Sequence, residues 1–381
     1  MATETDAQLR TQIVDTIRRF VDREVIPVAS KYEHADEYPA PLVERMRELG
    51  LFGATIPAEY GGLGLDYTTY AMVVEELCRG WMSLSGVLNT HLMFAYHVGS
   101  NGTDAQKRHW LPRLASGEER AGFCLTEAHA GSDTQNIRTV ARRDGDHYVV
   151  NGSKMFITNA QTATVFSLVA KTDPDAQPRH TGISLFAAPK GPGLTVGRHL
   201  DKLGYRGIET CEVNFEDYRL PADALIGGVE GRGLKVALSG LEVGRINIAS
   251  RAVGVARAAF EDAIRYAQER QTFGKPICEH QAIQIKLADM ATEIEAARLL
   301  TYKAAWLKDE GRPFGITAAQ AKLKTGRLAV RCAEEAVQIH GGYGYIEEYP
   351  VCRFYRDAKI LTIGEGTDEV QQMVIARALG A

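Results

Sequence analysis

Several features are missing from the 381-residue sequence, and each absence argues against a class of protein. No uninterrupted apolar run approaches the roughly 18 residues that a transmembrane helix needs. The net charge is only −4, which argues against a nucleic acid or an anionic membrane held by bulk charge. Residues 1–6 form neither the apolar core of a signal peptide nor an Arg-rich, acid-poor transit peptide. We therefore expect neither a membrane nor a nucleic acid as partner.

Common catalytic signatures are missing as well. The sequence has no Walker A loop, no HExxH motif and no GxSxG nucleophile elbow, which narrows the field of enzyme classes. Its six cysteines never fall into a CxxC spacing. That pattern fits free thiols in a reducing cytoplasm better than disulfides or a zinc site. We expect a cytoplasmic protein without a metal centre.

Helical periodicity dominates the first 120 residues. Leu9, Ile13 and Ile17 recur at four-residue steps with charged residues between them. Further helices are expected at 40–49, 67–79, 83–99 and 104–114. The Gly-rich segment 57–64 lacks the strand–turn–helix context of a nucleotide-binding fold and is interpreted as a structural loop. Residues 1–120 are predicted to form an N-terminal α-helical domain.

Between residues 121 and 230 the apolar period changes to two, which indicates strands. Strands are expected at 140–143, 147–150, 154–158, 164–171, 182–188 and 210–215. Asp144-Gly145-Asp146 is interpreted as a hairpin turn, and Asn151-Gly152 as a second tight turn. Residues 121–230 are predicted to form an antiparallel β-domain of sandwich or barrel type.

From residue 231 onward helical spacing returns. Apolar residues, many of them alanine, follow three- and four-residue steps over 249–267, 283–307 and 321–339. With a final helix after Thr367, these stretches predict an antiparallel four-helix bundle over residues 231–381. The predicted fold class is therefore α+β, with a β-domain between two helical domains.

A short stretch near the C-terminus carries the strongest candidate for chemistry. Glu365 stands between Gly364 and Gly366, which permit unusual backbone angles and close approach of a ligand. Thr367 can cap the following helix, and acidic residues in its first turn suit the positive end of the helix dipole. An ordinary polar turn between helices is the alternative, because Gly-rich turns with an acid are common.

Four other stretches combine glycine with polar or aromatic residues, and each has an ordinary structural alternative. Residues 124–133 could bind a flavin edge or a phosphate, or form a Ser/Thr turn. Phe156 and Thr158 leave a strand on one face, although Phe156 could simply pack in the core. Residues 270–276 offer an arginine for a pyrophosphate, or a solvated helix end. Residues 338–345 permit close ligand approach, or merely stop a helix.

In this order and spacing, these stretches resemble the acyl-CoA dehydrogenase family over essentially the whole chain. Residues 125–133 (LTEAHAGSD) are similar to the family's first signature. Residues 338–345 (QIHGGYGY), with Glu348, Arg353 and Asp357, are similar to its second. Residues 202–204 and 215–217 add matches within the β-domain. On this resemblance Glu365 is interpreted as the catalytic base.

The resemblance implies a flavoprotein with FAD between the β-domain and the bundle. It implies cofactor binding by Leu125, Thr126, Phe156, Thr158, Arg270, Gln281, Gln338, Gly341, Gly342, Thr367 and Glu369. Thr126 and Thr158 would bond the flavin ring and Phe156 would pack against it. Arg270, Gln281 and the loop 338–342 would hold the ADP part across a dimer interface, within a homotetramer built as a dimer of dimers.

The same resemblance implies acyl-CoA as substrate and electron-transfer flavoprotein as electron acceptor. Ser132, Glu242, Arg245 and Gly366 match positions at the acyl-CoA site. Glu365 would take the α-proton as the β-hydride passes to flavin N5, giving a trans-2-enoyl-CoA. Hydrogen bonds to the thioester oxygen, one of them from the Glu365 backbone N–H, would stabilise the enolate in a dry site.

Some positions depart from the family pattern. Gly364 replaces an aromatic residue of many straight-chain members, so a short or branched acyl group is expected. Gly244 has no side chain where some members carry the base, which excludes that variant. Asn89, His91 and His97 fall on the helix expected to border the acyl tail, where they indicate either a polar tail or core residues.

Two competing interpretations are a flavin oxidase or monooxygenase on the same fold, and a non-catalytic acyl-CoA-binding relative. Same-fold oxygen-using members generally lose the catalytic glutamate, whereas Glu365 is present. Retention of Glu365 together with the flavin-binding set also argues against a non-catalytic protein.

Overall fold

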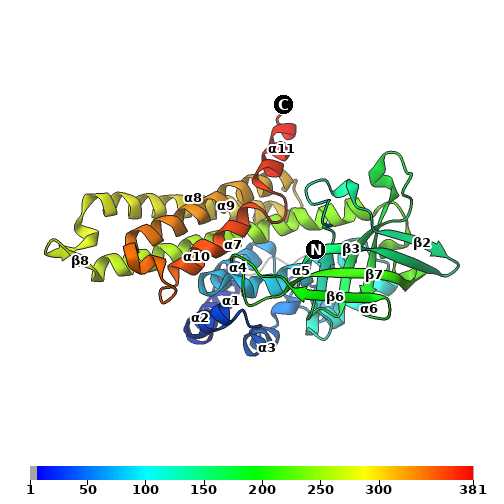
Figure 1. Cartoon of the computed structure of the whole chain (residues 1–381), viewed down its shortest axis with the longest axis horizontal. Coiled ribbons are helices and arrows are strands. Elements are labelled where there is room, and N and C mark those ends of the chain that lie inside the picture. Colours follow the sequence, from blue (N-terminus) through cyan, green and yellow to red (C-terminus); the bar gives the residue numbers. More distant parts are fainter. Residues whose placement is uncertain (1–6, 381) are drawn as a thin grey trace.

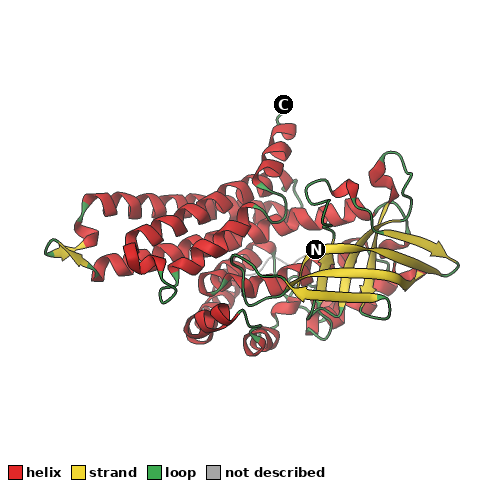
Figure 2. Cartoon of the chain, in the orientation of Figure 1, coloured by secondary structure: helices red, strands yellow, loops and turns green. Residues whose placement is uncertain are grey.

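The computed structural model describes residues 7–380, with helices at both ends of the chain and a β-domain between them (Figure 1, Figure 2). This arrangement confirms the predicted fold class. Residues 1–6 and 381 lie outside the described part. The predicted domains begin and end within these residues, and residues 1–6 were also considered for a targeting segment. The boundaries at 120 and 230 remain predictions.

The N-terminal part consists of helices that follow the predicted periodicity. They are α1 (Ala7–Phe20), α2 (Ile26–Ala35), α3 (Ala40–Glu48), α4 (Tyr67–Gly80), α5 (Met82–Asn101) and α6 (Asp104–Ser116), with a short π-helix, Val21–Val25, between α1 and α2. Polar caps fix two of the starts. Asp66 accepts a hydrogen bond from the Thr69 N–H at 2.6 Å at the start of α4, and Thr103 and Gln106 form a capping box on α6.

Helix α5 is the most deeply buried of these helices. It is apolar on nearly all sides, as expected for a helix in the interior of a large protein. It contacts α4, α6, α7 and the first strand. Residues on different faces of α5 therefore meet three different parts of the chain.

The β-domain is one seven-stranded sheet rather than a set of separate hairpins. Its strands are β1 (Ala121–Cys124), β2 (Val140–Asp144), β3 (His147–Thr158), β4 (Val165–Lys171), β5 (Ile183–Pro189), β6 (Leu194–His199) and β7 (Thr210–Pro221). The order is β1-β4-β2-β3-β7-β6, and β5 also pairs with β4. Most pairs are antiparallel, as predicted, but β4 runs parallel to β1 and β2.

The predicted turn at Asn151-Gly152 is wrong. β3 runs without interruption from His147 to Thr158 because β7 pairs with it on both sides of this dipeptide. The pairing register shifts between Val150 and Gly152, so the dipeptide makes a β-bulge. The hairpin turn predicted at 144–146 is confirmed by the β2–β3 pairing.

The C-terminal part is built on three long helices that lie side by side (Figure 1). They are α7 (Gly233–Glu269), α8 (Gln281–Asp309) and α9 (Gly315–His340), followed by α10 (Val351–Ala358) and α11 (Asp368–Ala378). A two-stranded hairpin, β8 (Gln271–Thr272) and β9 (Lys275–Pro276), joins α7 to α8. Alanines that are fully buried on α7 and α9 let these two helices pack closely.

Helix α7 connects all three parts of the molecule. It packs against α4 and α5, against α8 and α9, and against β5 of the sheet. Helix α11 contacts α9, and its C-terminal end projects away from the body (Figure 1). Among residues 7–380, no helix is both long enough and apolar enough to cross a bilayer.

Candidate active site

Glu365 lies in a strained loop between a short 3-10 helix, Lys359–Thr362, and α11. Its φ is 54°, in the left-handed region that residues with a side chain rarely adopt. Gly366 follows at a φ of 92°. Thr367 then caps α11 by accepting a hydrogen bond from the Val370 N–H at 3.3 Å, which confirms the predicted cap. The loop therefore presents Glu365 from the backbone.

Gln371, in the first turns of α11, holds this loop from beneath. Its buried amide donates to the carbonyl oxygens of Glu365 at 3.2 Å and of Gly366 at 3.1 Å. A Cβ at Gly366 would lie 2.5 Å from the Gln371 Nε2, so a side chain at 366 would displace this support. Gln371 was not predicted, because nothing in the local sequence shows that its side chain turns back toward the loop.

The Glu365 carboxylate points between α5 and α7. The Asn89 amide on α5 donates a hydrogen bond to Oε1. Oε2 is shielded from solvent, has no hydrogen-bond partner within residues 7–380, and faces Gly244 on α7. A Cβ at Gly244 would overlap Oε2. The absence of a side chain at 244 thus makes room for the base predicted at 365.

Burial raises the pKa of Glu365 above its ordinary value, whereas the positive charge of Arg251 and the hydrogen bond from Asn89 oppose that rise. Arg245 and Lys322 add smaller effects in the same direction as Arg251. The carboxyl group is therefore a stronger base than a solvated glutamate, while the nearby cations limit the rise of its pKa.

The predicted acyl-CoA residues are only partly brought together. Arg245 is 8% exposed and its charge acts on Glu365. Glu242 lies one turn earlier on α7, and Ser132 is exposed in the loop after β1. His91 and His97 are buried: His91 bonds the Phe52 and Leu114 carbonyls and His97 bonds Ser167. The two histidines are core residues, and only Asn89 of the three faces the site.

The β-domain presents the predicted flavin-facing residues at one place. The Met155 N–H donates to the Thr126 carbonyl at 2.8 Å, which joins the loop after β1 to β3. A register shift between Lys154 and Ile157 lifts Phe156 off the sheet at a φ of 61°, and its side chain is 63% exposed. The Thr126 and Thr158 hydroxyls are part-exposed, and neither bonds another described residue.

A buried ion pair supports this place. The Lys154 ammonium group is fully buried, 2.8 Å from Glu127 and 3.1 Å from the Leu125 carbonyl oxygen. Glu127 also accepts from the Thr139 N–H and hydroxyl. The pair fixes the backbone of Leu125 and Thr126 relative to β3. A lysine in a half-buried strand was the only sequence signal for it.

The remaining predicted cofactor residues lie far from Glu365. Arg270 ends α7, Gln281 begins α8, and Gln338 and Gly341-Gly342 end α9, beside the β8–β9 hairpin. Figure 1 shows this hairpin at the end of the helices opposite the β-domain. Arg270 follows Gly244 by 26 residues of helix, which is about 39 Å at 1.5 Å per residue. Within one chain, the predicted cofactor-binding residues therefore form two groups that lie far apart.

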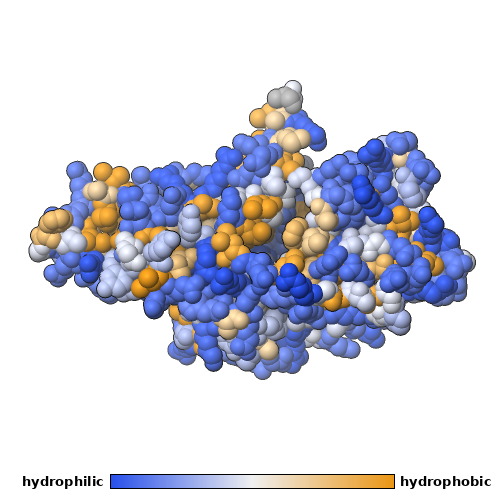
Figure 3. Space-filling model, viewed as in Figure 1, coloured by the Kyte–Doolittle hydropathy of each residue, from blue (hydrophilic) through white to orange (hydrophobic). Residues whose placement is uncertain are grey.

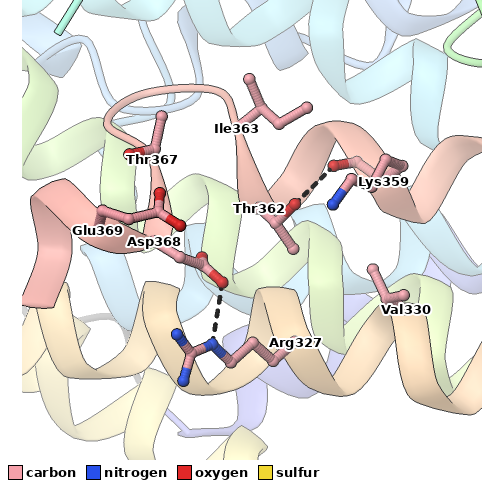
Figure 4. Close-up of a pocket in the computed structure, with 8 residues that line it drawn as sticks. All are labelled: Arg327, Val330, Lys359, Thr362, Ile363, Thr367, Asp368 and Glu369. Carbon is pink, nitrogen blue, oxygen red and sulfur yellow. Dashed lines mark hydrogen bonds and ion pairs between the residues drawn. The ribbon is translucent and has the colours of Figure 1, made fainter.

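A cavity of about 340 Å³ lies next to the Glu365 loop, on the side of α11. Thr367, Asp368 and Glu369 line one wall, Lys359 and Thr362 line the facing wall, and Arg327 and Val330 contribute from α9 (Figure 4). Arg327 bonds Asp368 at 3.0 Å. Thr367 and Glu369 were predicted to contact FAD, whereas Arg327 and Lys359 were missed. Figure 3 shows the surface hollowed near the base of α11, with hydrophobic residues at the rim.

Comparison with known families decides which group of proteins this architecture represents. Models described as the acyl-CoA dehydrogenase N-terminal, middle and C-terminal domains match residues 8–118, 122–218 and 231–380, respectively. The chain belongs to the acyl-CoA dehydrogenase family. The resemblance found in the sequence is confirmed, and the chain is an enzyme of the oxidoreductase class.

Individual acyl-CoA dehydrogenases cover nearly the whole chain. The mitochondrial short-chain specific acyl-CoA dehydrogenase of Bos taurus is 43% identical over 98% of this chain and 89% of its own length. The structure of butyryl-CoA dehydrogenase from Megasphaera elsdenii has a TM-score of 0.94 and 40% identity, and covers 99% of both chains. A glutaryl-CoA dehydrogenase from Mycobacterium smegmatis, in complex with FADH2, has a TM-score of 0.91 and 33% identity over 98% of this chain and 95% of its own.

Proposed function

We propose that this acyl-CoA dehydrogenase uses FAD to introduce a trans α,β double bond into a short or branched acyl-CoA, with Glu365 as the base that takes the α-proton. One observation carries the proposal. A carboxylate shielded from water stands at the junction of α5, α7 and α11, with one oxygen bonded and the other without a hydrogen-bond partner among residues 7–380. An unpaired buried carboxylate oxygen in a strained loop is a combination expected of a catalytic residue.

The backbone beside the carboxylate supports the same role. The Glu365 N–H has no acceptor among the described residues, whereas the N–H groups of Ile363 and Gly364 both donate to the Ile360 carbonyl. A free N–H on the residue that carries the base can donate to the thioester oxygen, where negative charge develops as the α-proton leaves. Glu365 would thus supply both the base and one donor for the enolate oxygen.

The residues around this junction fit FAD. Thr126 and Thr158 offer hydroxyls that bond no other residue in the described part of the chain, and Phe156 offers an exposed aromatic face on a β-bulge. The cavity next to Glu365 offers Thr367 and Glu369 together with the cations Arg327 and Lys359, which suit a phosphate-bearing group. When bound, FAD would supply the acceptor for the β-hydride. The chain itself positions the thioester, excludes water and removes the proton.

The distance between the two groups of cofactor residues supports a site shared by two subunits. Arg270, Gln281, Gln338 and Gly341-Gly342 would hold the ADP part of FAD on a neighbouring chain. Large hydrophobic side chains are exposed over this end of the helices, among them Phe273, Ile285, Tyr343 and Tyr345. Such residues are expected where subunits meet. We propose a homotetramer, built as a dimer of dimers.

Electron acceptor and compartment follow from the family resemblance and from the cysteines. We propose that electron-transfer flavoprotein reoxidises the enzyme. All six cysteines are free, which fits a reducing compartment such as the cytoplasm.

Gly364 leaves space beside the base, because a Cβ there would meet nothing nearer than the Ile360 carbonyl oxygen at 3.5 Å. This space supports a short acyl chain with room for a branch.

The test uses the purified holoenzyme and its flavin absorbance. Anaerobic mixing with butyryl-CoA is expected to bleach the flavin, and added electron-transfer flavoprotein is expected to restore turnover. A panel of straight, 2-methyl, 3-methyl and dicarboxylic acyl-CoAs would then rank the substrates. A flavin that stays oxidised with every acyl-CoA would contradict the proposal and favour a non-catalytic relative.

The rate at which oxygen reoxidises the reduced flavin distinguishes a dehydrogenase from the remaining alternative, a flavin oxidase. An acyl-CoA dehydrogenase that needs a protein acceptor stays bleached in air with excess substrate for far longer than an oxidase. Rapid return of the yellow colour with formation of hydrogen peroxide, without any acceptor protein, would support a flavin oxidase instead.

A further inference from the structure

Asn89 contacts the proposed base, Glu365, but has no role in the reaction proposed above. It lies on α5 and is 7% exposed. Its amide nitrogen donates to Glu365 Oε1 across 276 positions of sequence. A neutral amide can bond a carboxylate firmly without cancelling its charge, unlike a lysine or arginine in contact. Asn89 is therefore suited to hold a base that must stay available.

The two oxygens of Glu365 have different surroundings. Oε1 is bonded by Asn89, whereas Oε2 has no donor within the described part of the chain and lies against the bare Cα of Gly244. A carboxylate with neither oxygen held could rotate about its terminal bond, since torsions of this kind are broad. With Oε1 held, the direction of Oε2 is set.

We infer that Asn89 is the positioning residue of the base: it binds Glu365 Oε1 so that Oε2 alone receives the α-proton of the acyl thioester. This inference rests on the proposed function. The α-carbon–hydrogen bond breaks, its proton forms an O–H bond on Oε2, and the electron pair left on the α-carbon forms the double bond as hydride leaves the β-carbon. Bound FAD would supply the acceptor for that hydride.

Other charged and titratable groups act on the same carboxylate from a greater distance. They are Arg245 and Arg251 on α7, Lys322 on α9, Tyr70 on α4 and Tyr205 before β7, with Asp368 of α11 paired to Lys322. None of them forms a hydrogen bond or ion pair with Glu365 within residues 7–380. Arg251 instead bonds Asn247, Tyr205 and the Ser85 carbonyl. Asn89 is thus the direct partner, and its bond favours the ionised carboxylate.

The test follows the rate of anaerobic flavin reduction against pH, at limiting butyryl-CoA so that the profile reports the free enzyme. Asn89→Leu keeps the size of the side chain but removes the donor. The acid limb is expected to move to higher pH by about one unit, and the maximal rate to fall about tenfold because the carboxylate is no longer oriented. The matched control is Ser85→Ala, one turn earlier on α5, whose hydroxyl donates to the Met82 carbonyl and not to Glu365; its acid limb should not move.

A second variant keeps the inference testable if Asn89→Leu fails to retain FAD. Asn89→Asp places a carboxylate against Glu365, and two acids in one site share a proton. Its acid limb should move further up than that of Asn89→Leu. An unmoved acid limb in whichever variant retains flavin would overturn the positioning role.

Glu365→Gln, measured in the same series, separates this inference from the proposed function. Normal reduction by Glu365→Gln would refute the proposed function itself. Loss of reduction in Glu365→Gln, together with a wild-type profile for the Asn89 variants, would refute only the role of Asn89.

Discussion

Glu365 combines a conformation that costs free energy with a carboxylate that burial makes more basic. Left-handed backbone angles at a residue with a side chain persist only where the surroundings enforce them. Here Gln371 bonds the two carbonyls of the turn, and Thr367 caps the next helix. The strain is thus held by α11, and it aims the carboxylate at the gap between α5 and α7.

Gly244 defines how closely the base can approach α7. Gly244→Ala would place a methyl group where Glu365 Oε2 now lies. Because a displacement of about 1 Å can cost on the order of 100-fold in rate, we expect flavin reduction to slow by about that factor. FAD content should not change. Stopped-flow reduction by butyryl-CoA measures the effect.

Gly99 on α5 supplies the control for this substitution. It is also helical, and a Cβ there would meet nothing within 4 Å. Gly99→Ala should therefore leave the rate unchanged. Equal rates for Gly244→Ala and the wild type would mean that the carboxylate does not need its observed position.

Gly364 is expected to select the shape of the substrate. Its φ is not positive, and a Cβ there would have only ordinary contacts with Ile360, so a larger residue can be accommodated. Gly364→Tyr should lower kcat/KM for isobutyryl-CoA relative to butyryl-CoA by roughly tenfold or more, as one misfitting methyl group typically does. An unchanged ratio of the two kcat/KM values would show that other residues determine the preference for branched or straight acyl chains.

The loop residues could be interpreted from sequence because their chemistry is local. Glycines around an acid and a threonine before a helix have meaning within ten residues. Asn89 was predicted only to lie on the helix beside the expected acyl tail, and Gln371 was not predicted at all. Their contacts with the loop depend on how α5 and α11 pack, and an asparagine in an apolar helix has no pattern that says what it faces.

At the scale of elements, α5 is held by polar contacts inside the N-terminal part. His91 Nε2 lies 3.1 Å from the carbonyls of Phe52 and Leu114, so this nitrogen must carry the hydrogen. Its Nδ1 is buried and has no hydrogen-bond partner among the described residues. Burial lowers the pKa of His91 to about 4 and that of His97 likewise to about 4.

These histidines predict a loss of stability in mild acid. Between the ordinary pKa of about 6.5 and the folded value of about 4, the unfolded chain binds a proton that the folded chain refuses. The free energy of unfolding is therefore not reduced by these histidines above about pH 6.5. It falls as the pH drops toward 4, by about 2 kcal/mol per histidine between pH 7 and pH 5.

His91→Gln tests this expectation, because glutamine keeps an amide donor but does not titrate. The difference in Tm between pH 7 and pH 5 should become smaller than in the wild type. His180→Gln is the control, since His180 is exposed in the segment before β5, and its Tm difference should match the wild type. If all three proteins show the same difference, the buried histidines do not govern the acid sensitivity.

Most helices could be predicted to within a few residues because their apolar periods are long and regular. The short strands could not. β1 (Ala-Gly-Phe-Cys) lacks alternation and pairs in parallel with β4, Ala121 opposite Val165, and β6 is only half-buried. Asn151-Gly152 was misread because the same dipeptide suits a turn and a bulge, and only the pairing with β7 decides between them.

At the scale of the whole molecule, the order of the three parts follows from the sequence, whereas the sharing of a site between subunits does not. The two groups of cofactor residues are separated by about 39 Å of helix, a distance that becomes apparent only when α7 is seen as one element. A two-fold dimer brings residues of opposite ends together in two equivalent sites.

A shared site predicts complementation between two defective chains. Glu365→Gln lacks the base, and Arg270→Ala is expected to bind FAD weakly, so each alone should have little activity. In a mixed dimer, one site takes Glu365 from one chain and Arg270 from the other. Random mixing should restore about one quarter of the wild-type activity. Activity no greater than the mean of the two separate variants would show that each site belongs to one chain.

The central claim is that Glu365 removes the α-proton, and flavin reduction by Glu365→Gln tests it most directly. The variant should purify yellow, with the FAD content of the wild type, and dithionite should bleach it normally. Anaerobic butyryl-CoA, which should bleach the wild type at once, should bleach the variant at least about 100-fold more slowly, the usual effect of losing a general base. Bleaching of Glu365→Gln at the wild-type rate would contradict the account.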